Sequence, residues 1–383
     1  MIRIRKGGRW MKLLHTADLH LGKRFMDISL LEDQMDVLRQ IVHIAKINQV
    51  DGLLIAGDVY DKSVPSNEAM SAFNWFLEQL AALDISVFVI AGNHDSDERI
   101  AYLSHFVAQS HIYVSTKFSG TLQTIMMEDD NGPIAIHLLP FIKPIHVKKV
   151  YPEVEITTYE DAIQCVIDHS KMDYSIRNIL VAHQFITGGI TSDSEELSIG
   201  GLDHIQANVF DDFDYVALGH LHQAQRIQRD TLRYAGSIMK YAISEEHHHK
   251  SVTLVECNEK GNITYQLIPL TCLHQVRTIQ GTLSDILQMD YSEDYVRVIL
   301  TDEELIPDAR LSALTVFPNM VQYAIQNSKT EETMDIVVTE QIENKSISDL
   351  FSDFYQLQNN QVLPSDAHMA ILEEILEKIK EES

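Results

Sequence analysis

Cysteine is scarce in this chain of 383 residues, which has only three. Cys165, Cys257 and Cys272 are far apart in the sequence and form no CxxC pair. Since a disulfide framework and a thiolate zinc site both need paired or closely spaced cysteines, the sequence suggests neither. We expect three buried or inert thiols.

Basic residues are also few, with 30 Lys plus Arg against 56 Asp plus Glu and a net charge of −26. Such a field repels nucleic acid unless cations are concentrated locally. Three local clusters are present: Lys23 and Arg24; Lys143, His146, Lys148 and Lys149; and Arg226, Arg229 and Arg233. Either they contact phosphates without reading bases, or they are ordinary solvated side chains.

Long apolar runs are missing as well. No run of about 18 uninterrupted apolar residues appears, and the first residues, MIRIRKGGRW, lack the apolar segment of a signal peptide. The sequence contains no GxxxxGK[ST] motif, so we do not expect ATP binding through a P-loop. It also has no internal repeat. These absences favour a cytoplasmic protein without a membrane span.

The chain does contain a regular series of short apolar runs, in a composition of 45% hydrophobic and 22% charged residues that is typical of globular proteins. Residues 30–47, and the stretch that follows the typical N-cap residue Ser66, have the spacing of amphipathic helices. Five apolar runs that end at polar residues predict buried strands: residues 13–17, 53–56, 87–91, 179–182 and 215–218. The resulting order, βαβαβ, predicts an α/β fold.

Side chains that bind metals follow each of these predicted strands. In chain order they are Asp18 and His20, Asp58, Asn93 and His94, His183, and His220 and His222. Open α/β sheets bind ligands at the carboxyl ends of their strands, because the loops that leave this edge converge on one crevice. The topology therefore predicts that residues far apart in sequence meet in one site.

Two divalent cations suit the hydrolysis of a phosphodiester, whose anionic oxygens repel nucleophiles and whose leaving alkoxide is poor. Cations about 3.5 to 4 Å apart neutralise the phosphoryl oxygens and lower the pKa of a bound water to about 7. A bridging carboxylate holds such a pair, and imidazole and amide groups fill other positions. The side chains after the predicted strands are of these types.

The motifs occur in an order that resembles the calcineurin-like metallophosphoesterases: Asp18-Leu19-His20, Gly57-Asp58, Gly92-Asn93-His94-Asp95, His183 and Gly219-His220-Leu221-His222. The resemblance implies an α/β sandwich of two mixed β-sheets flanked by helices. It also implies that Asp58 bridges two metal ions. One ion would be completed by Asp18, His20 and His222, and the other by Asn93, His183 and His220.

The resemblance further implies a catalytic pair beside the metals. His94 would donate a proton to the leaving oxygen or stabilise the transition state, and Asp95 would orient its ring. Two divalent ions are expected as cofactors. Ligation by nitrogen and oxygen without thiolate favours Mn²⁺, with Fe or Zn as alternatives.

Longer stretches resemble the bacterial SbcD nuclease subunits: MKLLHTADLHLGK, DGLLIAGDVYD, VFVIAGNHDS, VALGHLH and RYAGSIMKY. This resemblance implies a Mn²⁺-dependent DNA nuclease that degrades duplex ends and opens hairpins, together with an SbcC-type ATPase, in recombination and repair. It implies a homodimer within a heterotetramer. Asp61 stands where archaeal and eukaryotic relatives have a His, so the role of that His does not carry over.

Four segments are expected along the chain. Residues 1–10 are an N-terminal extension, and residues 11–270, where the resemblance is dense, form the nuclease domain. Residues 271–340, with strand-like runs at 295–300 and 334–338, predict a small α+β cap domain. Residues 341–383 predict an acidic pair of amphipathic helices. These helices either dock on a partner or pack on the cap, and the family's layout favours docking.

Other functions share the same metal ligands. A small-molecule or cyclic-nucleotide phosphodiesterase would have all of them but would need neither a cap nor terminal helices. A protein phosphatase is disfavoured, because Asp58 is followed by Val59-Tyr60-Asp61, whereas such enzymes have a segment that resembles Val-Asp-Arg-Gly at this place. A binding subunit with an inactive site is the third alternative, and the intact ligand set argues against it.

A histidine tract, His247 to His249, also has the composition of a metal site. It lies among charged residues in a predicted turn before a strand at 252–255. Such surroundings favour an exposed loop over a second metal site.

Overall fold

The computed structural model describes residues 10–96, 111–195 and 204–328, the backbone of residues 3–5, and short pieces between residues 351 and 372. The chain divides into two compact units, Met1–Ile299 with Asp308–Ala324, and Leu300–Pro307 with Ile325–Ser383. The predicted strand at 334–338 and most of the two predicted C-terminal helices lie outside the described residues. The division predicted at residues 271 and 341 stays a prediction.

Two mixed β-sheets form the centre of the first unit. The seven-stranded sheet has the order β1 (Arg3–Arg5), β8 (Gln123–Asp129), β9 (Gly132–Leu139), β10 (Arg177–His183), β11 (Tyr215–Gly219), β13 (Arg229–Tyr234) and β12 (Gln225–Ile227). The six-stranded sheet has the order β15 (Ile263–Pro269), β14 (Ser251–Cys257), β2 (Met11–Thr16), β5 (Gly52–Ala56), β6 (Ser86–Ile90) and β7 (Ile112–Ser115). Strands β2, β5, β6 and β7 run parallel, as do β9, β10, β11 and β13.

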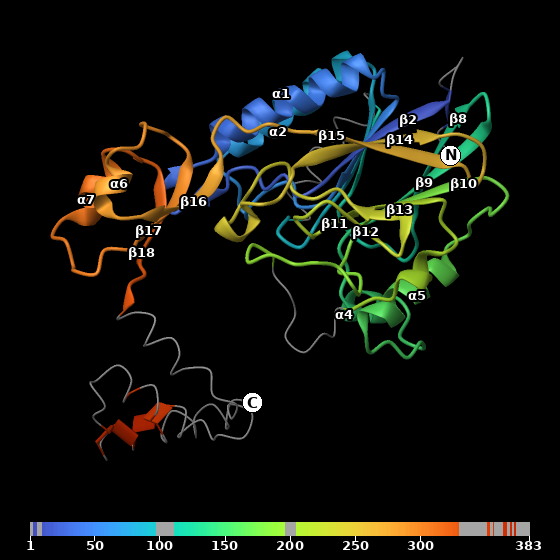
Figure 1. The fold of residues 1–383 in the computed structure, drawn as a ribbon. Coiled ribbons are helices and arrows are strands. Elements are labelled where there is room, and N and C mark those ends of the chain that lie inside the picture. The colour runs from blue at the N-terminus through green and yellow to red at the C-terminus, as the bar shows by residue number, and fades with distance from the viewer. Residues whose placement is uncertain are drawn as a thin grey trace. The chain divides into compact units, whose positions relative to one another are not determined.

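Helices cover the outer face of each sheet (Figure 1). Helices α1 (Leu31–Ile47) and α2 (Asn67–Ala82) pack on the six-stranded sheet through one apolar cluster. Helix α5 (Tyr159–His169), the short α4 (Pro144–Lys148) and η2 (Ala207–Phe210) pack on the seven-stranded sheet through a second cluster. A third cluster, with Leu54 and Phe88 against Ile136 and Val181, joins the inner faces of the sheets. The predicted sandwich of two mixed sheets flanked by helices is confirmed.

The elements predicted from apolar spacing are confirmed with small shifts at their ends. All five predicted strands are present as β2, β5, β6, β10 and β11, and the helix predicted at 30–47 is α1. Ser66 is the N-cap of α2, and its side chain accepts a hydrogen bond from the Ala69 amide at 3.2 Å. Of the three cysteines, all free, Cys165 and Cys257 are buried and Cys272 is half-buried.

A three-stranded sheet follows the two large ones in the chain. It has the order β16 (Val276–Gly281), β17 (Tyr295–Leu300) and β18 (Met320–Ile325), with the short helices α6 (Leu283–Ile286) and α7 (Ala309–Leu314) between its strands in sequence. The strand predicted at 295–300 is β17. Within the second unit, the Ser328 hydroxyl donates to the Glu303 carboxylate at 2.6 Å.

Arg177, at the first residue of β10, links the two large sheets at the end of β10 away from His183. Its guanidinium is 2% exposed and donates to both carboxylate oxygens of Asp129, at 3.0 and 2.5 Å. It also donates to the carbonyls of Cys257, Asn258 and Gly132. A buried charge needs several hydrogen-bond partners, since its desolvation is costly.

No helix among the described residues is long and apolar enough to cross a membrane.

Candidate metal centre

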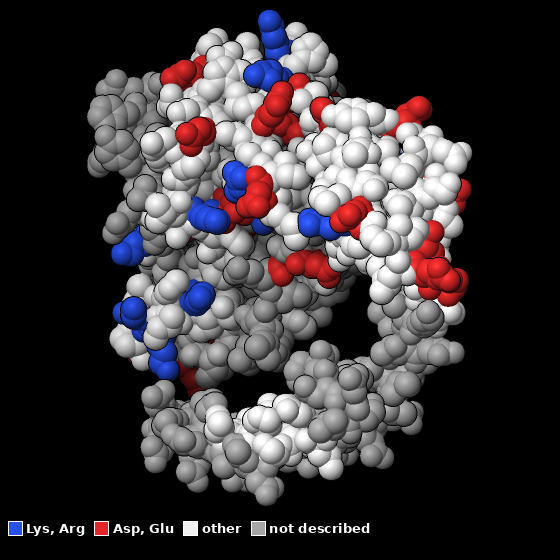
Figure 2. Space-filling view, turned by 90° about the vertical axis from the view of Figure 1, so that its left-hand side faces the viewer, with Lys and Arg blue, Asp and Glu red and all other residues white. Residues whose placement is uncertain are grey.

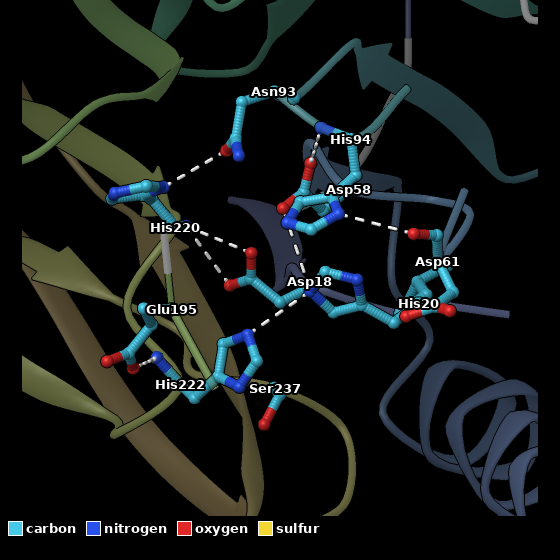
Figure 3. Close-up of polar contacts among 12 residues, drawn as sticks. Asp18, His20, Asp58, Asp61, Asn93, His94, Glu195, His220, His222 and Ser237 are labelled. Atoms are coloured by element: carbon cyan, nitrogen blue, oxygen red, sulfur yellow. Dashed lines mark hydrogen bonds and ion pairs between the residues drawn. The ribbon is translucent and has the colours of Figure 1, made fainter. Parts of the chain in front are cut away.

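The predicted ligands come together where the carboxyl ends of strands from the two large sheets meet (Figure 3). Strands β2, β5 and β6 of the six-stranded sheet end just before Asp18, Asp58 and Asn93. In the seven-stranded sheet, His183 is the last residue of β10 and His220 follows β11 directly. Each of the two facing sheets therefore contributes part of the side chains of one site.

One half consists of Asp18, His20 and His222, whose donor atoms all lie within 4.8 Å of one another. The three side chains are almost completely buried. The Nε2 atoms of His20 and His222 are 3.1 Å apart. Two buried imidazole nitrogens and a carboxylate that face one point are a donor set that fits a divalent cation.

The other half centres on the side-chain oxygen of Asn93. This oxygen lies 3.0 Å from His183 Nε2 and 3.1 Å from His220 Nδ1. The convergence of an amide oxygen and two imidazole nitrogens again suits a divalent cation. The division of these side chains between two ions stays a prediction, since donor atoms of Asp18, Asp58 and His183 also lie within 4.8 Å of one another.

Asp58 lies between the two donor sets. Its Oδ2 atom is 3.6 Å from His20 Nε2 and 3.3 Å from His183 Nε2. Its other oxygen, Oδ1, accepts the His94 amide at 3.0 Å, which fixes the orientation of the carboxylate. This is the position that a bridging ligand requires.

The backbone is strained at four of these residues, because Asp18, His20, Asp58 and His220 have φ values of 51°, 42°, 50° and 105°. Non-glycine residues rarely adopt positive φ, and such strain persists only where surrounding contacts enforce it. Here the amide of His20 donates to the Asp58 carbonyl at 2.9 Å, and the amide of His220 donates to Asp18 Oδ1 at 3.0 Å. The ligand loops thus hold one another in the strained form.

Glycines precede several ligands because the loops pack too closely for a side chain. A Cβ at Gly92 would collide with the Asp58 carboxylate, and a Cβ at Gly219 would collide with the Ala56 carbonyl and the His183 ring. The Gly-Asn-His and Gly-His pattern therefore reflects close packing around the ligands.

Burial and mutual charge shift the protonation of the site. Burial raises the pKa of Asp18 to about 7 and lowers that of His220 to about 3. Burial alone would raise the pKa of Asp58 and lower that of His183. The attraction between their charges outweighs burial, so the pKa of Asp58 lies well below its usual value and that of His183 rises to about 9. A cation that binds between these side chains would compete with the proton on His183, so we expect its affinity to fall as pH falls.

His94 is half-buried at the edge of the site, next to His20 and Asp58. Its ring packs edge-on against the His20 ring, with centroids 4.9 Å apart, and its Nδ1 lies 3.2 Å from the Asp61 carbonyl. Partial exposure would allow the ring to reach a substrate. Its donor atom also falls within 4.8 Å of donor atoms from His20 and Asp58, so the geometry alone does not separate it from the ligands.

Asp95 lies differently from the prediction that it orients His94. Its carboxylate accepts the amides of Val59 at 3.1 Å, Tyr60 at 3.0 Å and Gly92 at 2.9 Å. Burial and the nearby Asp58 raise its pKa to about 6. Asp95 therefore braces the loops that carry Asp58 and Asn93, because three backbone donors occupy the carboxylate.

Gln34, on the buried face of α1, was not predicted to serve the site. Its amide nitrogen donates to the His20 carbonyl at 2.8 Å and its oxygen accepts the Gly22 amide at 3.0 Å. It also donates to the Tyr241 hydroxyl at 3.1 Å. The available signal was a glutamine within the apolar stripe of the predicted helix at 30–47.

The histidine tract lies between two buried residues but is not itself buried. His247 and His249 are exposed, as the predicted loop requires, and none of the tract belongs to a candidate metal group among the described residues. Glu245 and Lys250, which flank the tract, are instead buried beside His222. Burial lifts the pKa of the Glu245 carboxyl, but its contacts with His222 and Lys250 outweigh this and hold that pKa well below its usual value. No feature of the sequence marked these two residues.

Two of the three predicted basic clusters are engaged within the chain. Lys23 pairs with Asp61 at 2.9 Å and Arg24 donates to the Asp27 carbonyl. The third cluster is not a surface patch, because Arg233 is 3% exposed and lies under the Tyr265 ring. Its other members are Arg226, paired with Asp230, and Arg229, which donates to the Phe210 carbonyl. In the remaining cluster, Lys143, Lys148 and Lys149 on and beside α4 are exposed.

The fold and the donor set define a metal-dependent phosphoesterase. A family model described as calcineurin-like phosphoesterase matches residues 11–224, and one described as type 5 capsule protein repressor C-terminal domain matches residues 272–359. Within the calcineurin-like phosphoesterases, the chain belongs to the SbcD family, the nuclease subunits of SbcCD.

Two relatives, each named as the D subunit of the SbcCD nuclease, carry this assignment. The one from Staphylococcus saprophyticus is 31% identical over 385 residues, with 97% of this chain and 99% of the relative covered. The one from Staphylococcus epidermidis is 32% identical, with 92% and 95% covered. A solved dimetal phosphatase from Danio rerio is similar at 11% identity with a TM-score of 0.39, over 68% of this chain and 98% of its own. The family model and the two SbcCD relatives show that the chain is a metal-dependent nuclease of the hydrolase class.

Proposed function

We propose that this chain is a Mn²⁺-dependent DNA nuclease, both a double-strand exonuclease and a hairpin and single-strand endonuclease. It would act with an SbcC-type ATPase in DNA recombination and repair, in the cytoplasm, where the nucleoid lies. The single observation that carries the proposal is the convergence of seven side chains of metal-ligand type from two sheets, in a chain whose relatives are named as nucleases.

The proposed roles follow the two donor sets. Asp58 bridges the ions, and the two sets complete one ion each, Asp18, His20 and His222 on one side and Asn93, His183 and His220 on the other. When bound, the two ions neutralise phosphoryl oxygens and make a water nucleophilic at neutral pH. Ligation by nitrogen and oxygen without thiolate favours Mn²⁺. His94 donates a proton to the leaving oxygen from its half-exposed position at the rim.

DNA binding by an acidic chain needs a local cation patch, and the Lys143–Lys149 region supplies one. Phe141 lies against the His183 ring with centroids 6.2 Å apart, and the exposed Lys143 follows two residues later. A phosphate backbone entering the metal site along α4 would therefore pass these cations. On the face shown in Figure 2, several basic side chains gather toward the lower left, while acidic side chains are scattered over the face and lie beside basic ones at the centre and the top. Such contacts position DNA without reading its sequence.

The proposed function is tested by measuring which substrates the protein cleaves. Purified protein with Mn²⁺ is offered linear duplex DNA, a DNA hairpin or a cyclic nucleotide, with the SbcC-type ATPase added or withheld. We expect cleavage of both DNA substrates, which EDTA abolishes and Mn²⁺ restores better than Mg²⁺ or Zn²⁺. Turnover of the cyclic nucleotide alone would favour the small-molecule phosphodiesterase and end the proposal.

Deletion of residues 341–383 is expected to leave Mn²⁺-dependent nuclease activity within about two-fold of the full chain while abolishing co-purification with the ATPase. The reason is that the sequence predicts amphipathic helices there, beyond the predicted nuclease domain, whose apolar faces would suit a partner's helices. The measurement pairs a nuclease assay with affinity co-purification and size-exclusion chromatography, which also tests the expected homodimer within a heterotetramer. Unchanged co-purification would place the docking surface elsewhere.

A further inference from the structure

One metal-facing imidazole, that of His222, is held from behind by a buried carboxylate. Its Nδ1 lies 2.9 Å from Glu245 Oε1, while its Nε2 faces His20 Nε2 in the candidate metal site. The Ser194 hydroxyl is also 2.7 Å from Nδ1. A hydroxyl either donates or accepts, but an ionised carboxylate only accepts, so Glu245 alone selects the form of His222 with a proton on Nδ1.

Lys250 in turn fixes Glu245. Its ammonium group donates to Glu245 Oε2 at 2.6 Å, to the Ser237 hydroxyl at 2.7 Å and to the His222 carbonyl at 2.9 Å. These three acceptors use all three protons of the ammonium group. Glu245 is 0% exposed and Lys250 6% exposed, so the ion pair is shielded from solvent. Lys250 thus holds both the backbone of His222 and the carboxylate that contacts its ring.

The other imidazoles of the site are held differently. His183 Nδ1 lies 2.8 Å from the Ala56 carbonyl. His20 Nδ1 is buried and has no hydrogen-bond partner among the described residues. A carboxylate therefore supports one ligand of the set formed by Asp18, His20 and His222, while the neighbouring His20 is held by packing.

We propose that Glu245, fixed by Lys250, is a positioning residue that keeps the proton of His222 on Nδ1 and so leaves the Nε2 lone pair for a divalent cation. The inference rests on the proposed metal site. A ligand histidine oriented in this way keeps a single ring orientation and a single tautomer, and loss of the supporting group weakens metal binding by about 10- to 100-fold.

The substitution Glu245→Gln tests the mechanism by reversing the selection. The ammonium group of Lys250 can only donate, so the glutamine oxygen must face Lys250 and its NH₂ group must face His222 Nδ1. We expect Nδ1 then to accept from this NH₂ group, which moves the proton to Nε2 and removes the metal-binding lone pair. Changing Lys250 to methionine as well frees the glutamine oxygen to face His222. The double variant E245Q/K250M should therefore recover what E245Q loses.

The experiment has two readouts. Isothermal titration calorimetry with Mn²⁺ should show two ions bound to the wild type, one of them about 10- to 100-fold weaker in E245Q, and a return to within about three-fold of the wild type in E245Q/K250M. Histidine ¹⁵N NMR of the metal-free protein should show the Nδ1–H form of His222 in the wild type and in the double variant, and the Nε2–H form in E245Q. The His222 signal is assigned by its loss in His222→Gln.

Asp129→Asn is the matched control, because it disturbs another buried ion pair, that with Arg177, at the end of β10 away from the site. Full Mn²⁺ affinity in Asp129→Asn supports the proposal, whereas an equal loss in both variants overturns it. Unchanged affinity in E245Q, or an Nε2–H form in the metal-free wild type, also overturns it. A wild type that never binds a second ion would instead refute the proposed function, and the NMR measurement still decides the role of Glu245, even if E245Q fails to fold.

Discussion

Replacement of Asp58 by alanine is expected to remove both metal ions and to lower kcat/KM for DNA cleavage by about 10³-fold or more. The reason is the position of its carboxylate, with Oδ2 3.6 Å from His20 Nε2 and 3.3 Å from His183 Nε2, between the two donor sets. Asp18, the other carboxylate of the predicted ligand set, also lies within 4.8 Å of donor atoms from Asp58 and His183, but among the contacts of the described residues only Asp58 has an oxygen within 3.6 Å of both His20 Nε2 and His183 Nε2. Without Asp58, each cation would lose a ligand and the charge that holds the pair together.

Metal content after dialysis, measured by mass spectrometry, and cleavage of linear duplex DNA test this prediction together. Asp51→Ala is the control, since Asp51 is a buried carboxylate at the other end of the same strand, β5, and accepts the Lys12 amide at 2.9 Å. It should keep two ions and wild-type cleavage. Asp58→Ala with two ions, or with the wild-type rate, would show that this carboxylate does not bridge.

The ligand positions could be read from the sequence because they depend on strand ends. Apolar runs such as residues 53–56 and 179–182 end abruptly, and parallel strands bring their carboxyl ends to one edge of the sheet. The donor type then follows directly, as with Asp58 after β5 and His183 at the end of β10. The strands and their ends were predicted correctly, because position along a strand determines position in space.

Hydrogen-bond partners could not be read in the same way, because they depend on packing between distant loops. Asp95 is adjacent in sequence to His94, yet its carboxylate accepts amides from the loops after β5 and β6. Glu245 lies in a charged stretch typical of an exposed loop, yet it is buried against His222, which is 23 residues away. The local sequence shows that a residue is charged, but it does not show which partner offsets the cost of burying that charge.

The same limit applies to the basic clusters. Proximity in sequence grouped Arg226 with Arg233, but their strands β12 and β13 pair in a sheet, so Arg233 lies buried against Tyr265 while Arg226 is exposed. Lys23 lies close to the site, where its amide donates to the His20 carbonyl at 3.0 Å, but Asp61 balances its charge. The only cluster that keeps exposed lysines among the described residues is the one around α4, a surface helix.

Replacement of His94 by alanine is expected to leave both ions in place and to lower the rate of DNA cleavage by about 10²- to 10⁴-fold, the usual contribution of a general acid. Its ring lies beside His20 and Asp58 but is half-exposed, as a group that meets a substrate oxygen must be. Metal content and single-turnover cleavage of duplex DNA are the measurements. His43→Ala, at an exposed position of α1, is the control and should change neither.

The leaving group distinguishes the two roles that the geometry allows His94. An alkoxide needs a proton as it departs, whereas a p-nitrophenolate does not. If His94 donates that proton, His94→Ala should lose far more activity on DNA than on bis(p-nitrophenyl) phosphate. If His94 is instead a third ligand beside His20 and Asp58, the variant should lose an ion and both activities should fall together. Equal losses of activity on the two substrates, with one ion missing, would therefore show that His94 is a metal ligand and not the proton donor. The contact of its Nδ1 with the Asp61 carbonyl, at 3.2 Å, would then orient the ligand ring.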